Sequence, residues 1–255
     1  MQEFKVKNHE LVNGSCWIAY FDILGFKDLL SKYYGLLDMF VGDYYEKILK
    51  EVEAKVHPWQ DKLTATWASD SYLFFSFNDT IESFCCIYLL SQRFFNALIL
   101  KHIPVRGTLT SGCLYADDNR RIYVGPGLID AYEYSEKQNW IGLVLTPSVK
   151  QALKGTDFSD YLDEARDLIK YDVPIKKKKN INGVMQPELA SERLYVYKFS
   201  SFFGLSDAEK IIRTMYQIAK NKFGKDQKCS YEDKYENTLK FIEHLKQKSG
   251  INADV

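Results

Sequence analysis

The chain has 255 residues, of which 46% are apolar, and this suits one domain with an appendage or two small domains. Lysine plus arginine and aspartate plus glutamate number 34 each, so the formal net charge is zero and no overall field attracts nucleic acid or a membrane surface. No apolar run approaches the ~20 residues of a bilayer span, and the polar N-terminus lacks a signal-peptide core. The five cysteines have no zinc-like spacing, which favours reduced thiols in a cytoplasmic protein.

The first half of the chain alternates between strand and helix patterns. Residues 14–23 predict a strand, and apolar residues spaced by three and four from Phe26 to Val52 predict a helix or a helix pair. Residues 63–77 predict two short strands around a tight turn at 68–70. A strongly apolar helix follows, with Asp79 or Thr80 as its N-cap.

The second half predicts further strands and helices, and their order defines a fold class. A glycine-interrupted strand is expected over 103–117, then a strand, turn and helix over 120–138, a strand and helix over 140–153, and a last strand over 194–199. The order is β-α-β-β-α-β followed by α-β additions, the ferredoxin-like, split βαβ arrangement. The sequence therefore predicts an α+β fold.

The composition changes after Phe202, where two charged amphipathic helices are expected over 205–223 and 231–248. We therefore divide the chain into a main domain, 14–202, and a C-terminal helical extension, 203–255. The extension can serve as a dimer arm, as a lid on the core, or as the partner-binding part of a structural adaptor.

Two carboxylates stand out as candidate functional groups. Asp22 interrupts the apolar run "WIAYFDILGF", where an unpaired charge would cost several kcal/mol, and Asp70 sits in the predicted hairpin turn. In a ferredoxin-like sheet the first strand lies beside that hairpin, so the two carboxylates can converge and repel each other. A divalent cation removes the repulsion, and oxygen ligands suit magnesium or manganese. The alternative is that Asp70 is only a turn residue.

Five segments in the same order resemble the class III nucleotidyl (adenylate and guanylate) cyclases. They are "FDILGF", "TATWASDSYLFFSF", "VRGTLTSGCLY", "YVGPGLIDAYEYSE" and "YDVPIKKKKN…LYVYKF", which together cover about residues 14–200. Within this superfamily, the Leu-Gly-Phe form, the small size and the helical tail look most like the pyrimidine cyclases of bacterial antiphage signalling (Pycsar). The resemblance implies a cyclase palm in which a nucleoside triphosphate becomes a 3′,5′-cyclic monophosphate plus pyrophosphate.

The resemblance also implies metal-binding and phosphate-binding residues. Asp22 and Asp70, with the carbonyl of Ile23, would hold two Mg²⁺ or Mn²⁺ ions that activate the ribose 3′-hydroxyl and bind the triphosphate. Further triphosphate contacts are implied for the segment after the first strand, for the arginine of the third motif, and for the lysine run, which would reach the site from the other subunit. These residues are Gly25, Phe26, Lys27, Arg106, Lys176 and Lys177.

The base and ribose positions depart from the family pattern. Ile129 and Glu133 stand where the family has an asparagine and an arginine that orient ribose and stabilise transition-state charge. Loss of one such group can cost ~10²–10³ in rate. The expected pocket positions, Thr66 or Trp67, Ile122 and Asp130, do not copy the adenine or guanine readers, and Trp67 could narrow the pocket toward a pyrimidine or belong to the core.

We expect a pyrimidine cyclase, with UTP ahead of CTP. The resemblance implies that its product is a second messenger for a separate effector in antiphage defence. A purine cyclase and an inactive nucleotide-binding or dimerisation module are the alternatives. The family resemblance implies a homodimer with two sites, each completed across the subunit interface.

Overall fold

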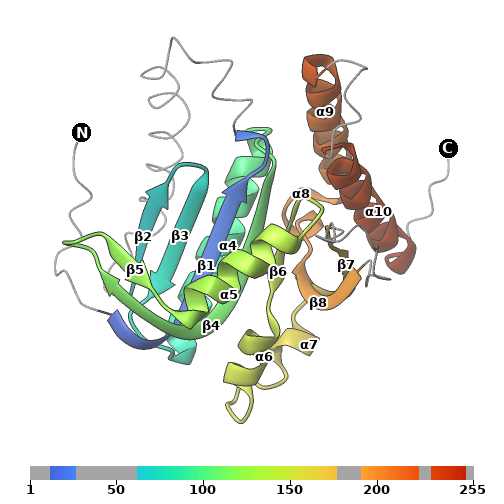
Figure 1. Cartoon of the computed structure of the whole chain (residues 1–255). Coiled ribbons are helices and arrows are strands. Elements are labelled where there is room, and N and C mark those ends of the chain that lie inside the picture. The colour runs from blue at the N-terminus through green and yellow to red at the C-terminus, as the bar shows by residue number, and fades with distance from the viewer. Residues whose placement is uncertain (1–11, 27–61, 177–190, 224–230, 251–255) are drawn as a thin grey trace, which may run out of the picture.

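The computed structural model describes residues 12–26, 62–176, 191–223 and 231–250, and these form a mixed sheet covered on both faces by helices (Figure 1). Strand β1 (Val12–Ile23) pairs antiparallel with β3 (Ser71–Ser76) and with β4 (Val105–Asp117). The helix or helix pair predicted from Phe26 to Val52 lies outside the described residues beyond its first residue.

The strand order confirms the predicted fold class. The order is β2-β3-β1-β4-β6-β8-β7, and β5 pairs with β4 off this path. Its β2-β3-β1-β4 part is the ferredoxin-like arrangement, which places the predicted hairpin beside the first strand. The remaining strands are β2 (Leu63–Ala68), β5 (Ile122–Val124), β6 (Gly142–Leu145), β7 (Leu168–Pro174) and β8 (Ser191–Tyr197).

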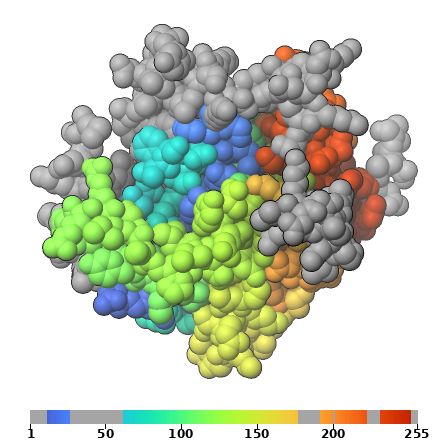
Figure 2. Space-filling view, in the orientation of Figure 1, coloured from blue at the N-terminus to red at the C-terminus, as the bar shows by residue number. Residues whose placement is uncertain are grey.

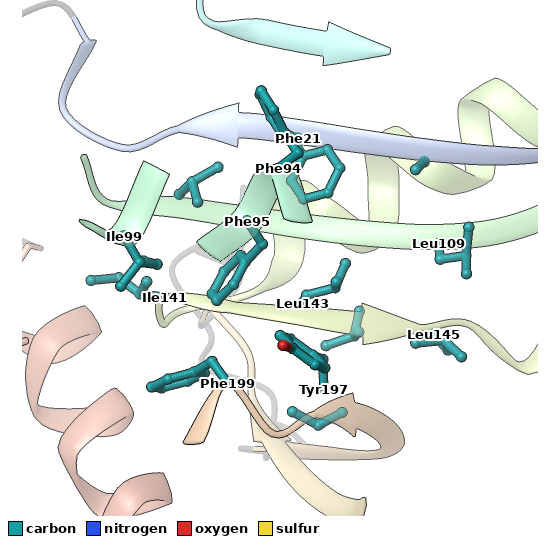
Figure 3. Close-up of a cluster of buried hydrophobic side chains, with 14 of the residues drawn as sticks. Phe21, Phe94, Phe95, Ile99, Leu109, Ile141, Leu143, Leu145, Tyr197 and Phe199 are labelled. Carbon is teal, nitrogen blue, oxygen red and sulfur yellow. The ribbon is translucent and has the colours of Figure 1, made fainter. Parts of the chain in front are cut away.

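One face of the sheet carries the main hydrophobic core against helix α4 (Ile81–Leu100). Thr80 is the N-cap of this helix, and its hydroxyl accepts a hydrogen bond from the Ser83 amide at 3.3 Å. Aromatic rings of α4 meet those of the strands in this core, as between Phe94 and Phe21, whose ring centroids are 5.0 Å apart (Figure 3). The α4 side of the sheet thus holds the larger of the two clusters of buried hydrophobic side chains in the described structure.

Helix α5 (Pro126–Lys137) crosses the other face of the sheet (Figure 1). A Cβ on Gly127 would lie 2.9 Å from the backbone of Gly112 in β4, so two glycines let the helix backbone approach the strand closely. Figure 2 shows α5 and the β4–β5 hairpin on the surface of this face. The close approach holds the N-terminal end of α5 against the middle of β4.

The C-terminal helices pack on the same core as α4. Helix α9 (Leu205–Phe223) has the predicted bounds, and α10 (Glu232–Lys248) begins one residue later than predicted. Phe241 of α10 is fully buried, with its ring centroid 5.0 Å from that of Trp140 and 4.7 Å from that of Tyr171. The division at residue 202 stays a prediction, and in the structure the helices after it complete the main core.

Some elements were not predicted from the sequence. Strand β7 and the short helix α7 (Tyr161–Glu164) were missed, and α8 (Ser200–Phe203) follows the last strand. Helix α6 (Pro147–Leu153) was predicted. The prediction that no apolar run approaches the length of a bilayer span is corrected by α4, which is long and apolar enough by length and composition. However, 72% of that stretch is buried inside the protein.

Candidate functional site

Asp22 lies near the end of β1 on the face of the sheet that α5 covers. Its neighbours Phe21 and Ile23 belong to the α4-side core, so the pleat directs Asp22 to the opposite face. Directly across from it stand Ser71 of β3 and Arg106 of β4. Because opposed residues in an antiparallel pair share a face, Asp22, which is 8% exposed, lies between these two side chains.

Asp70 is brought to the same end of the sheet by the β2–β3 turn. The carbonyl oxygen of Asp70 accepts a hydrogen bond from the Ile23 amide at 2.9 Å, which ties the turn to the residue after Asp22. Ser69 adopts a positive φ of 57° in this turn. The Leu24 amide is bound to the Pro104 carbonyl at 2.8 Å, and Gly25 takes the left-handed conformation that ends the strand. The β2–β3 turn thus brings Asp70 to the end of the sheet where β1 carries Asp22.

Arg106 forms an ion pair with the buried Asp22 carboxylate. Its Nε and Nη2 lie 2.8 and 2.6 Å from Oδ2 of Asp22. Its Nη1 donates to the carbonyl oxygens of Glu136, at 3.1 Å, and Gln138, at 3.3 Å, and Nη2 also contacts the Glu136 carboxylate. An arginine has five N–H donors, and each of them has a partner here. In this conformation Arg106 positions Asp22 and has no donor left for a phosphate.

The C-terminal end of α5 holds Arg106 in this arrangement. The last carbonyls of a helix lack helical partners and carry partial negative charge, so they accept from a guanidinium favourably. Gln138, which is fully buried, donates from Nε2 to the carbonyl of Gly107, at 3.2 Å, and to the Thr108 hydroxyl, at 3.0 Å. The indole of Trp140 donates to Oε1 of Gln138 at 2.9 Å. The helix end and β4 are therefore joined beside Arg106.

Lys176 lies on the other side of Glu136. Its amide donates to the Lys137 carbonyl at 2.7 Å, and its Nζ is 3.3 Å from Oε2 of Glu136. Burial and the charge of Arg106 lower the pKa of Lys176 to about 8, while Asp22 opposes this shift. The resemblance implied approach from another subunit, but Lys176 is already close to Asp22 of its own chain. Lys27 and Lys177, the other candidate lysines, lie outside the described residues.

The electrostatics of Asp22 reflect three opposing influences. Burial raises the pKa of its carboxyl above the usual value, the Arg106 guanidinium opposes this rise, and the negative charge of Asp70 adds to it. Asp70 is thus close enough for its negative charge to oppose ionisation of the Asp22 carboxyl. A bound cation at this point would remove the repulsion between them.

The donor set at Asp22 and Asp70 fits a magnesium-type ion. Within the described ranges no group of three or more His, Cys, Asp or Glu side chains could hold a metal. Magnesium is commonly held by one or two carboxylates together with water and substrate phosphates, so two aspartates and the Ile23 carbonyl are a sufficient protein contribution. The residues present thus suit a metal that binds with a phosphorylated substrate.

The expected base-pocket residues are not gathered around Asp22 in this chain. Thr66 and Trp67 are consecutive in β2 and so face opposite sides of the sheet. The indole N–H of Trp67 donates to the Ser69 carbonyl at 2.5 Å, and its ring packs against the α4-side core. Ile122 of β5 is 41% exposed, and Asp130 of α5 is half-buried. Trp67 is therefore a partly buried residue at the margin of the core.

The two departures from the family pattern lie on the outer side of α5. Ile129 is 59% exposed, and Glu133 is also exposed. Neither is among the contacts of Asp22 or Arg106. Ile129 and Tyr132, with Ile122 and Val124 of β5, form a set of exposed apolar side chains near α5, which we call the α5 patch.

A cavity of about 560 Å³ lies away from the two aspartates, beside β6, β8 and α6. Lys150 and Lys170 line it, and their Nζ atoms are 3.6 and 2.5 Å from the carboxylate of Asp163. Arg193, a further cation on its wall, is 2.7 Å from Asp172. Three of the cations on its wall are thus paired with carboxylates.

Two residues near the site were missed by the sequence analysis. Glu136 had no motif to mark it, because its role depends on where α5 ends against β4. Lys234 of α10 is close enough to Arg106, Lys176 and Asp22 for their charges to change its pKa. A signal for Lys234 was present: it precedes Thr238 by one helical turn on the stripe that continues through Phe241 and Leu245, all three of which are buried.

Comparison with solved structures identifies the fold. No protein-family model matches the chain, and no curated protein is similar enough to count as a match. The catalytic core of a rhodopsin-guanylyl cyclase with converted specificity, in complex with ATPαS, superposes with a TM-score of 0.51 at 15% identity, covering 72% of this chain and 95% of that one.

Two further structures show weaker likeness. An adenylate cyclase from Trypanosoma brucei gives a TM-score of 0.48 at 11% identity over 77% of this chain and 92% of that one. The non-canonical dimeric guanylyl cyclase domain from Blastocladiella emersonii gives 0.46 at 16% identity over 74% and 97%. The strand order and the likeness to the rhodopsin-guanylyl cyclase core show that the chain has the α+β palm fold of class III adenylyl and guanylyl cyclase catalytic domains.

Proposed function

We propose that this protein is a metal-dependent nucleotidyl cyclase that converts a nucleoside triphosphate to its 3′,5′-cyclic monophosphate and pyrophosphate. The observation that carries the proposal is the meeting of Asp22 and Asp70 at one end of a cyclase-type sheet, with Arg106 holding Asp22 in place. A buried carboxylate beside a second carboxylate is costly for stability, and such pairs are typical of sites that bind cations or perform chemistry.

In this proposal the carboxylates of Asp22 and Asp70 and the carbonyl of Ile23 hold Mg²⁺ or Mn²⁺. When bound, two such ions lower the pKa of the ribose 3′-hydroxyl and neutralise charge on the triphosphate. The 3′-oxygen bonds to the α-phosphorus, the bond from that phosphorus to the bridging oxygen breaks, pyrophosphate leaves, and the hydroxyl proton passes to water. Arg106 keeps Asp22 oriented, and Lys176 offers its charge to the phosphates.

The substrate base and the biological role extend the proposal beyond the reaction class. We favour UTP, then CTP, because Thr66 and Ile122 do not copy the purine-reading pair and the motifs look most like antiphage pyrimidine cyclases. A cytoplasmic enzyme whose product reaches a separate cyclic-nucleotide-sensing effector follows from the same resemblance. A purine cyclase fits the fold equally well.

A homodimer completes the proposed site. Thr66, Ile122 and Asp130 are not gathered around Asp22 within one chain, so a second copy would supply base and ribose contacts. The α5 patch, with side chains 41–59% exposed, offers apolar surface for that contact. The exposed Ile129 and Glu133, in place of the family asparagine and arginine, support the alternative of an inactive nucleotide-binding module.

The direct test is to incubate the purified protein with each of the four nucleoside triphosphates and Mn²⁺ and to identify the products by chromatography and mass spectrometry. A cyclic pyrimidine monophosphate with equimolar pyrophosphate, lost in Asp22→Asn and in Asp70→Asn, is the expected result. Cyclic AMP or GMP alone would replace the pyrimidine assignment with the purine one. Formation of no cyclic nucleotide, with folding intact, would reject the cyclase and leave the binding module.

A further inference from the structure

The C-terminal helix α10 is fastened to the segment that leads into the candidate site. The Thr238 hydroxyl accepts a hydrogen bond from the Ile141 amide at 2.8 Å, and Nδ2 of Asn237 donates to the Asn139 carbonyl at 2.9 Å. Residues 139–141 directly follow Gln138, whose carbonyl accepts from Arg106. The next residue, Gly142, lies opposite Arg106 across the β4–β6 pair. The fastening therefore sets α10 beside Arg106.

Lys234 lies one helical turn before Thr238 on the docked side of α10. The Thr238 hydroxyl donates to the Lys234 carbonyl at 2.7 Å, and Lys234 is half-buried. Burial, Arg106 and Lys176 lower the pKa of Lys234 to about 8, and Asp22 alone opposes them. In the described ranges no carboxylate is in salt-bridge contact with its Nζ. A partly buried ammonium group beside two other cations is an unfavourable arrangement for the protein alone.

The other two cations are less able to receive a polyphosphate. Arg106 is 4% exposed, and its five N–H donors are accounted for by four hydrogen bonds and the ion pair of Nη2 with Asp22. Lys176 is paired with Glu136. Lys234 is therefore the member of this trio that has positive charge without a carboxylate contact in the described structure. An anionic group entering beside Asp22 would relieve the repulsion among the three.

We propose that Lys234, supplied in cis by the C-terminal helix, is a phosphate-binding residue of the site and takes the contact that the buried Arg106 cannot make. This inference rests on the proposed function for the identity of the ligand, a nucleoside triphosphate. It assigns α10 a role at the site in addition to closing the core.

The test measures binding of inorganic tripolyphosphate by calorimetry in EDTA, so that neither metal nor turnover is needed. Lys234→Met is compared with Lys234→Arg and with Lys240→Met, which removes an exposed lysine of the same helix. One charge-assisted contact corresponds to a loss of about 10- to 100-fold in affinity for Lys234→Met. Lys234→Arg should stay within a few-fold of the parent, and Lys240→Met should be unchanged.

Equal tripolyphosphate affinity in the parent and Lys234→Met overturns the inference, and so does the absence of measurable binding to the parent. Circular dichroism and thermal melts establish that each variant is folded. The inference and the proposed function fail separately. Lys234-dependent binding without any cyclic product would leave the anion site and reject the cyclase, whereas cyclic product with Lys234-independent binding would do the reverse.

Discussion

Asp22 and Arg106 form a cross-strand ion pair in which Nε and Nη2 of the guanidinium both contact the same carboxylate oxygen, Oδ2. The two partners do not depend on each other equally. Arg106 also donates to Glu136 and Gln138, whereas Asp22 has Arg106 as its salt-bridge partner in the described structure. Removing the arginine therefore leaves a buried carboxylate beside Asp70, while neutralising the aspartate leaves the arginine with most of its partners.

We expect this asymmetry in unfolding experiments. Arg106→Ala should lower the free energy of unfolding by about 3–5 kcal/mol, because it strands a buried charge. Asp22→Asn should cost about 1–2 kcal/mol, because an amide oxygen still accepts from Arg106. Both values come from urea denaturation at neutral pH without added metal.

The exposed pair of Arg193 and Asp172 provides the control for this comparison, since its side chains are 60% and 56% exposed. Arg193→Ala should change stability by at most about 1 kcal/mol. Equal losses for Arg106→Ala and Asp22→Asn would show that Asp22 does not depend on Arg106 as the geometry indicates.

The sequence was sufficient to predict the elements whose burial is periodic and local. The β2–β3 hairpin, the Thr80 cap and the bounds of α9 follow from patterns within a few residues. Strand β7 was missed because it lies at the edge of the described sheet. Its partly buried Ile169 and Tyr171 alternate with exposed residues and do not form an apolar run. Its polar Lys170 and Asp172 made the segment resemble a loop.

The convergence of Asp22 and Asp70 could be anticipated because it depends on strand order alone. The full set of hydrogen-bond partners of Arg106 could not be anticipated, because several of them come from the end of α5. The position of that end is set by tertiary packing. The position of Lys234 depends in the same way on how α10 docks. Strand order thus brings the two aspartates to one end of the sheet, whereas the positions of the cations near them required the folded chain. The assignment of a metal site to these aspartates stays a prediction.

The docking of α10 depends on one buried threonine. Thr238 is fully buried, and its hydroxyl is the acceptor for the Ile141 amide at 2.8 Å. Thr238→Val keeps the shape but leaves that amide without its acceptor, so we expect a loss of about 1–3 kcal/mol in the free energy of unfolding. Thr238→Ser should retain most of the stability, because it keeps the hydroxyl.

Thr214→Val on the exposed side of α9 is the matched control, since the Thr214 hydroxyl donates only to the Lys210 carbonyl of its own helix. It should change stability by less than about 0.5 kcal/mol. Similar effects of the valine substitution at both positions would argue against a specific role for the Thr238–Ile141 hydrogen bond.

The α5 patch makes the homodimer testable. Ile129 is 59% exposed, and Ile129→Arg places a charge in the proposed apolar contact, which should shift the protein toward monomer in light-scattering measurements at micromolar concentration. Leu100→Arg, at a 52% exposed position at the end of α4, should leave the mass unchanged. A parent protein that is monomeric at all concentrations, with or without nucleotide, would contradict the homodimer.

The lowered pKa of Lys234 predicts a specific pH dependence of stability. Between its folded pKa of about 8 and the value of 10.5 for a free lysine, the unfolded chain binds more protons at this position than the folded chain does. Stability contributed by this group therefore rises with pH across that window. Below about pH 8 the full cost of the buried charge is present, so Lys234→Met should be more stable than the parent at pH 7, by roughly 1–3 kcal/mol.

The charged groups that face Lys234 are Arg106, Lys176 and Asp22, with Glu136 paired to Lys176. All of them remain in Lys234→Met, so the difference in unfolding free energy between the two proteins isolates the lysine. That difference, measured in urea from pH 7 to 10.5, should be largest at pH 7 and should shrink above about pH 8. A constant difference, or a parent more stable than Lys234→Met at pH 7, would mean that the ammonium group is not under the repulsion inferred from its position.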